Sequence, residues 1–124
     1  MRALVIDDSK AIRIILRRLL AELGFEVVEA ADGREALQRL AASESPFDLA
    51  LVDWNMPEMN GLEFVREVRG RQGHEDLTMV MVTTETEAGQ VVRALAAGAN
   101  EYIMKPFSRD VLVDKLSMLG LVPA

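Results

Sequence analysis

Several residue types that define common protein classes are missing or scarce in this chain of 124 residues. Cysteine is absent, which excludes a disulfide scaffold and a thiolate metal site. A single histidine, His74, cannot build a His-rich zinc site. No apolar run approaches the roughly 18 residues that a membrane-spanning helix needs, and no charged-then-apolar leader precedes the first apolar run. We therefore expect a cytoplasmic protein that does not enter a membrane.

Basic residues are also in deficit. The chain has 14 Lys+Arg against 20 Asp+Glu, a net charge of -6. Nucleic-acid binding requires a basic face opposite the phosphate backbone, so it is excluded as the main role. The length is close to the commonest size of a domain, and we expect residues 1–124 to form one domain with no output domain attached.

Short apolar segments alternate with segments of helical periodicity. The first helix is the clearest, because apolar residues recur at helical spacing between Ser9, a typical N-cap, and Gly24, a typical stop signal. The whole pattern predicts strands at 3–6, 26–30, 49–53, 79–82 and 102–104. They alternate with helices at about 10–23, 34–42, 88–97 and 109–119 and with a third helix that carries Leu62, Val65 and Val68. Such alternation is typical of an α/β fold with a parallel sheet.

Polar side chains stand where the predicted strands end. Asp7 and Asp8 follow the first strand, Asp53 ends the third, Thr83 ends the fourth and Lys105 follows the fifth. In an open parallel sheet the carboxyl ends of the strands form the binding crevice, so these residues can converge on one pocket. Because carboxylates this close repel one another, the arrangement indicates a cation between them. We interpret it as a magnesium site beside a nucleophilic aspartate.

Each of these residues has an ordinary structural interpretation when it is taken alone. An Asp or a Thr at a strand end is usually a helix cap or a turn residue, and a lone Lys is usually solvated. Aromatic residues that flank a strand, such as Trp54 and Tyr102, usually pack. The basic residues Arg13, Arg17 and Arg18 on the first helix are interpreted as a solvated face, with docking to an acidic partner as the alternative.

Taken together, the motifs resemble the receiver domains of two-component response regulators, most closely the CheY-type single-domain chemotaxis regulators. The resemblance covers nearly the whole chain. Its segments are Val-Ile-Asp-Asp-Ser at 5–9, Asp-Trp-Asn-Met-Pro-Glu-Met-Asn-Gly-Leu-Glu at 53–63, Met-Val-Thr at 81–83, Gly-Ala at 98–99 and Tyr-Ile-Met-Lys-Pro-Phe at 102–107. It implies a flavodoxin-like, doubly wound (βα)5 fold, with a five-stranded parallel sheet of order 2-1-3-4-5 and helices on both faces.

The resemblance also implies a metal site and a phosphoacceptor. Asp53 is expected to accept a phosphoryl group. Asp7, Asp8 and Asp53, together with the backbone carbonyl of Asn55, are expected to hold Mg²⁺. Lys105 is expected to pair with the phosphoryl group, through a cis peptide bond to Pro106. Such a site fits the chemistry, because attack by a carboxylate on phosphorus needs cations that face the phosphoryl oxygens.

The resemblance further implies a switch and a signalling role. Thr83 is expected to report the phosphoryl group and Tyr102 to rotate in response, which reshapes the face formed by the fourth helix, the fifth strand and the fifth helix. The chain is then a monomeric signalling protein, not an enzyme, that receives its phosphoryl group from a sensor histidine kinase or a phosphotransfer protein and contacts a downstream effector. Chemotaxis is one candidate process, although Glu87 stands where flagellar-switch-binding members carry lysine. Asn55 and Glu85 match the chemotaxis type, which predicts a short phosphoryl lifetime.

Two other functions stay open at this point. A phosphatase of the haloacid-dehalogenase type also uses an aspartyl phosphate and Mg²⁺, but it would need a general acid where Asn55 stands. A non-phosphorylated, flavodoxin-like adaptor or flavin-binding module is the other alternative. Its flavin-binding version is weakened because no Gly-rich or hydroxyl-rich phosphate loop follows the first strand.

Overall fold

Five strands pair into one parallel sheet in the computed structural model, which describes residues 1–84 and 89–121. The strands are β1 (Arg2–Ile6), β2 (Glu26–Ala30), β3 (Leu49–Asp53), β4 (Thr78–Thr83) and β5 (Glu101–Met104). The helices are α1 (Lys10–Glu22), α2 (Gly33–Ala42), α3 (Gly61–Arg69), α4 (Val91–Ala97) and α5 (Arg109–Met118). The sheet order is β2-β1-β3-β4-β5, which confirms the predicted fold class.

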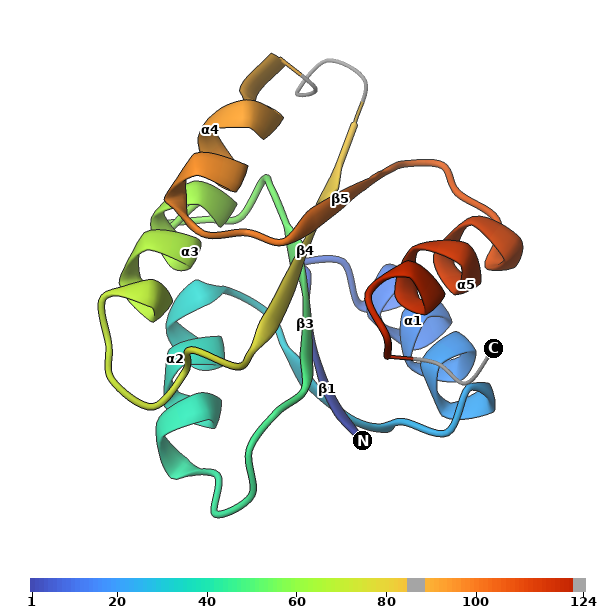
Figure 1. The fold of residues 1–124 in the computed structure, drawn as a ribbon, viewed down its shortest axis with the longest axis horizontal. Helices are drawn as coiled ribbons and strands as arrows, with labels where there is room; N and C mark the ends of the chain where they lie inside the picture. Colours follow the sequence, from blue (N-terminus) through green and yellow to red (C-terminus); the bar gives the residue numbers. More distant parts are fainter. Residues whose placement is uncertain (85–88, 122–124) are drawn as a thin grey trace.

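Helices cover both faces of the sheet, with α1 and α5 on one side and α2, α3 and α4 on the other (Figure 1). Successive strand residues point to opposite faces, so each strand feeds two cores. On β1, Val5 packs toward α1 and α5, whereas Leu4 and Ile6 pack toward α2, α3 and α4. The central strand β3 is buried at every position. This explains why its sequence is a continuous apolar run and not an alternating one.

Local sequence signals determine where most helices begin. The side chains of Ser9, Asp32, Asn60 and Ser108 each accept a hydrogen bond from a backbone N–H in the first turn of the helix that follows. After α1, Gly24 adopts a positive φ of 93°, a conformation that glycine reaches without steric cost. These side-chain caps set the first residue of α1, α2, α3 and α5.

Apart from the start of α4, the predicted helix boundaries are right to within one or two residues. Helix α2 begins at Gly33 and not at 34, and α5 ends at Met118, one residue before the predicted end. Helix α4 begins at Val91, three residues after the predicted start at 88. Residue 88 itself, Glu85 and Glu87 lie outside the described residues. Across the described ranges, no helix is both long and apolar enough to cross a membrane.

At the amino ends of β4 and β5, away from the predicted site, Arg69 joins the α3–β4 loop to the α4–β5 loop. Its guanidinium donates hydrogen bonds to the carbonyls of Gly98, His74 and Leu77 and to the side chain of Asn100, over 2.7–2.9 Å. Gly98 has a φ of 122°, and a Cβ there would lie 2.5 Å from Cγ of Arg69. The close packing of Arg69 on Gly98 therefore fixes the turn between α4 and β5.

Candidate functional site

Three acidic side chains meet at the carboxyl edge of the sheet, where β1 and β3 are neighbours. Asp7 and Asp8 follow β1 and Asp53 ends β3, and one carboxylate oxygen from each lies within 4.8 Å of the other two. Asp7 is 2% exposed and Asp53 is 6% exposed, whereas Asp8 is exposed to solvent. Carboxylate oxygens are hard ligands, and a partly open cluster of this kind fits Mg²⁺, which keeps several waters when bound. The donor set therefore suits the predicted metal.

Lys105 supplies positive charge to the same cluster. Its Nζ lies 3.1 Å from Oδ1 of Asp53 and 3.3 Å from Oδ2 of Asp7. The backbone N–H of Lys105 donates to the carbonyl of Thr83, which extends the pairing of β4 and β5 by one residue and directs the lysine toward the cluster. The peptide bond between Lys105 and Pro106 is cis, as the resemblance implied.

The charges at this site alter one another's protonation. Burial, followed by the neighbouring charge of Asp7, raises the pKa of Asp53 from 3.8 to about 6, although Lys105 opposes the rise. Burial alone would lower the pKa of Lys105, but its hydrogen bond to Asp53 and the charges of Asp53 and Asp7 outweigh burial and raise that pKa. Lys105 is therefore protonated at neutral pH. Asp53 is ionised at neutral pH, although burial and the charge of Asp7 make its ionised form less favourable than it would be in water.

The two residues predicted to form the switch lie on the same face of neighbouring strands. Thr83 is fully buried at the end of β4, and its hydroxyl donates to the carbonyl of Thr84 at 3.2 Å. Tyr102 on β5 pairs in register with Met81, two residues before Thr83, and packs against the core beneath α2, α3 and α4. Nζ of Lys115 lies 5.0 Å from the centre of the Tyr102 ring.

Asn55, in the loop between β3 and α3, is exposed to solvent. The preceding residue, Trp54, is 5% exposed and belongs to the core, which confirms its interpretation as a packing residue. The carbonyl of Trp54 accepts a hydrogen bond from the N–H of Gly61 at 2.9 Å. A Cβ on Gly61 would lie 2.9 Å from the Asp53 carbonyl and 2.5 Å from Cε of Met81, so this close approach of α3 to β3 requires glycine.

One contact of the site was missed by sequence reasoning. Arg13 was interpreted as part of a solvated face, and this is wrong. Its side chain is only 15% exposed, and its Nη1 donates to the backbone carbonyl of Asp7 at 2.6 Å. The sequence signal for this contact was weak, because two arginines one turn apart on an amphipathic helix, such as Arg13 and Arg17, are usually both exposed on the surface.

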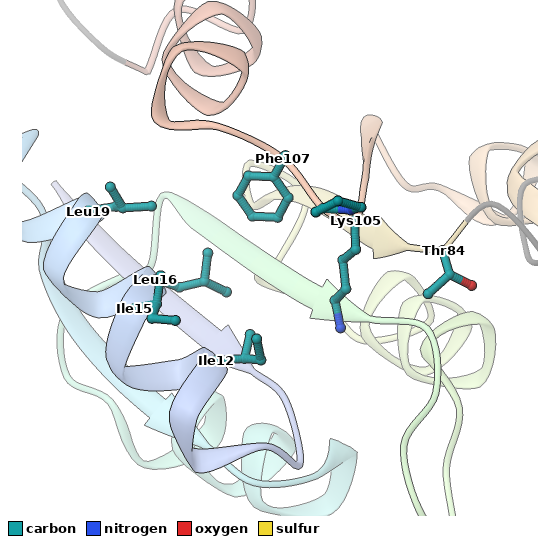
Figure 2. Close-up of a pocket in the computed structure, with 8 residues that line it drawn as sticks. Ile12, Ile15, Leu16, Leu19, Thr84, Lys105 and Phe107 are labelled. Carbon is teal, nitrogen blue, oxygen red and sulfur yellow. The ribbon is translucent and has the colours of Figure 1, made fainter.

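An apolar groove of about 500 Å³ lies beside the acidic cluster and shares Lys105 with it. In Figure 2 the side chains of α1 lie along one side, and those of the segment after β5 lie along the other. The lining residues are Ile12, Ile15, Leu16, Leu19, Thr84, Lys105, Pro106 and Phe107. The charged cluster of aspartates and Lys105 thus lies next to an apolar surface.

Comparisons with known proteins agree on one family. The model of the response regulator receiver domain matches residues 3–117. The Chemotaxis protein CheY homolog of Campylobacter jejuni is 47% identical over 94% of this chain and 89% of its own length. Chemotaxis protein CheY1 of Helicobacter pylori is 43% identical over 96% of each chain. The structure of CheY4 of Vibrio cholerae superposes with a TM-score of 0.86 at 38% identity, over 94% of this chain and 96% of that one.

Proposed function

Because this chain belongs to the response regulator receiver domains, of the CheY type, we propose that Asp53 accepts a phosphoryl group in a Mg²⁺-dependent reaction. The observation that carries the proposal is the convergence of Asp7, Asp8, Asp53 and Lys105 at one edge of the sheet. Lys105 contacts carboxylate oxygens of both Asp53 and Asp7, and we assign the carboxylate of Asp53, at the end of β3, as the nucleophile. We infer that the donor is the phosphohistidine of a sensor kinase or a phosphotransfer protein.

Each residue has a defined part in the proposed transfer. An oxygen of the ionised Asp53 carboxylate forms a new bond to phosphorus, while the P–N bond of the donor breaks and its electron pair returns to the imidazole. Asp7, Asp8 and the Asn55 carbonyl would hold Mg²⁺, whose chemistry there is to offset the negative charge of the phosphoryl oxygens. Lys105, kept protonated by its acidic neighbours, moves from the Asp53 carboxylate to a phosphoryl oxygen.

The proposed signal leaves the site through Thr83 and Tyr102. A phosphoryl oxygen offers the Thr83 hydroxyl a stronger acceptor than the Thr84 carbonyl that it contacts at 3.2 Å. If the Thr83 side chain turns to that acceptor, the space beside β5 changes on the face where Tyr102 packs. A modification shifts a conformational equilibrium only through contacts made in one state, and this hydroxyl supplies such a contact. The reshaped surface would be the α4-β5-α5 face.

We also propose that the chain acts alone, as a cytoplasmic monomer that contacts an effector protein. This is supported by the match to CheY-type proteins over 89–96% of their own length. Receiver domains of this type are signalling proteins, so the chemistry is limited to gain and loss of the phosphoryl group on the protein itself. The names of the relatives make chemotaxis the proposed process.

A small acyl phosphate tests the proposal without a partner. We expect Mg²⁺-dependent addition of one phosphoryl group, seen by intact mass, that EDTA abolishes and that Asp53→Asn removes. Asp114→Asn is the matched control, because Asp114 is an exposed aspartate on α5 and its replacement should leave labelling unchanged. Undiminished labelling of Asp53→Asn would place the acceptor at another residue.

A further inference from the structure

Asp8 lies on the exposed side of the acidic cluster. Because little packing surrounds an exposed side chain, the direction of its carboxylate depends on the backbone that carries it. The residue before it is held firmly. The N–H of Asp7 donates to the carbonyl of Ala30 at 3.1 Å, and Oδ1 of Asp7 accepts from the N–H of Ser9 at 2.8 Å. The carbonyl of Asp7 accepts from Nη1 of Arg13 at 2.6 Å.

This last hydrogen bond controls the orientation of the peptide group that leads into Asp8. A peptide unit is planar, so the carbonyl of Asp7 and the N–H of Asp8 turn together. When the guanidinium of Arg13 holds the carbonyl, the plane is fixed, and with it the direction in which the Asp8 side chain leaves the backbone. A rotated peptide would move the Asp8 carboxylate out of reach of the other two.

Arg13 is itself anchored on the far side. Its Nε donates to Oε1 of Glu29 on β2 at 3.2 Å. Glu29 also pairs with Arg17, one turn further along α1, at 3.0 Å, but the Arg17 side chain is 50% exposed, against 15% for Arg13. Because a guanidinium is planar and rigid, holding Nε on Glu29 aims Nη1 at the Asp7 carbonyl. Both arginines pair with Glu29, and Arg13 in addition donates a hydrogen bond to the Asp7 carbonyl in the loop after β1.

We propose that Arg13 is a positioning residue for the divalent metal: it fixes the Asp7–Asp8 peptide and so aims the Asp8 carboxylate into the cluster. The inference rests on the proposed function only in that the cluster binds Mg²⁺. Arg13 touches neither the metal nor the phosphoryl group. It acts through the backbone of its neighbours.

The sign of its effect separates positioning from simple electrostatics. Removing a positive charge near a cation site makes the site more negative, so electrostatics alone predicts tighter Mg²⁺ binding. Loss of a fixed ligand direction predicts weaker binding. Replacement of groups that orient metal ligands weakens metal affinity by about 10-fold to 100-fold. The two explanations therefore predict changes of opposite direction in one measurement.

The test is a calorimetric titration of MgCl₂ into three folded proteins: wild type, Arg13→Met and Arg17→Met. Arg17→Met removes the same charge and a salt bridge to the same glutamate, Glu29, but leaves the hydrogen bond from Arg13 to the Asp7 carbonyl. We expect the dissociation constant to rise about 10-fold in Arg13→Met and to change by less than about twofold in Arg17→Met, whose exposed charge is screened. Unchanged or tighter binding in Arg13→Met, or equal weakening in both variants, would overturn the inference. A wild type that does not bind Mg²⁺ would overturn the proposed function instead.

A second variant keeps the test decisive if Arg13→Met does not fold. Arg13→Lys retains the charge and most of the aliphatic stem, but a single ammonium cannot reproduce the fork that joins Glu29 to the Asp7 carbonyl. We expect weaker Mg²⁺ binding here too, together with a shifted Asp8 amide resonance in the metal-free protein, which reports the rotated peptide directly. Wild-type affinity with an unmoved Asp8 resonance would reject the positioning role.

Discussion

Burial next to Asp7 raises the pKa of the Asp53 carboxyl to about 6, so its ionised form is less favourable in the folded protein than in the unfolded chain. A group whose folded pKa is raised contributes stability below its unfolded pKa of 3.8, and that stability is lost as the pH rises toward 6. Asn has the same shape, carries no charge and can still accept a hydrogen bond from Lys105. We therefore expect Asp53→Asn to stabilise the metal-free protein at neutral pH.

The size of this effect follows from the pKa. A rise from 3.8 to about 6 corresponds to at most about 3 kcal/mol at neutral pH. Solvent reaches the open side of the cluster and screens its charges, which lowers the expected gain to about 2 kcal/mol. For a domain of this size, that gain raises the melting temperature by about 8 °C. Below about pH 4 both proteins should be equally stable at this position, and the difference should grow between about pH 4 and 6.

Unfolding by urea, followed by circular dichroism in EDTA across this pH range, measures the difference. Asp114→Asn is again the matched control, since its exposed carboxylate should give a difference near zero. Added Mg²⁺ should stabilise the wild type and narrow the gap, because the ion binds the folded acidic cluster. An Asp53→Asn protein that is less stable than wild type in EDTA at neutral pH, or a gain that does not vary with pH, would refute the reasoning.

Three further outcomes are expected. Asp8→Ala should reduce Mg²⁺-dependent labelling by acyl phosphate to near zero, measured by intact mass, and unchanged labelling would exclude Asp8 from the metal site. Tyr102→Ala should leave labelling intact but give the same effector affinity with and without the phosphoryl group, measured by calorimetry, and a preserved difference would remove Tyr102 from the switch. Gly98→Ala should cost about 2 kcal/mol in urea unfolding, because alanine is strained at this positive φ and its Cβ would meet the side chain of Arg69. Gly89→Ala, with open space around it, should cost far less, and equal losses would contradict this.

The fold and the acidic cluster could be predicted because both depend on repeated, local signals. Parallel strands end at a common edge, so the position of Asp53 after one apolar run and of Asp7 after another was enough to bring them together. The caps at Ser9 and Asn60 follow from side-chain chemistry within a few residues. Lys105 followed from the same rule, applied to the last strand.

Arg13 and the pKa of Asp53 could not be predicted in this way. The bond from Arg13 to the Asp7 carbonyl depends on the rotation of α1 against β2, and that rotation places Glu29 within reach of Nε. Sequence periodicity assigns a residue to a face of a helix, but it does not say which backbone carbonyl lies opposite. The pKa of Asp53 depends on how deeply its carboxyl is buried, which is a property of packing.

The hydrogen bond from the N–H of Gly61 to the Trp54 carbonyl closes residues 55–60 into a small ring between the end of β3 and the start of α3. Forming this hydrogen bond costs the conformational entropy of closing a short loop. Once formed, the hydrogen bond fixes the number of residues that fit between the strand and the helix. Insertions and deletions here would open the ring and move the Asn55 backbone, while exchanges of exposed side chains would not. Among natural versions of this segment, the exposed positions should therefore vary in residue type, while the number of residues stays constant and Asn60 is kept as the cap of α3.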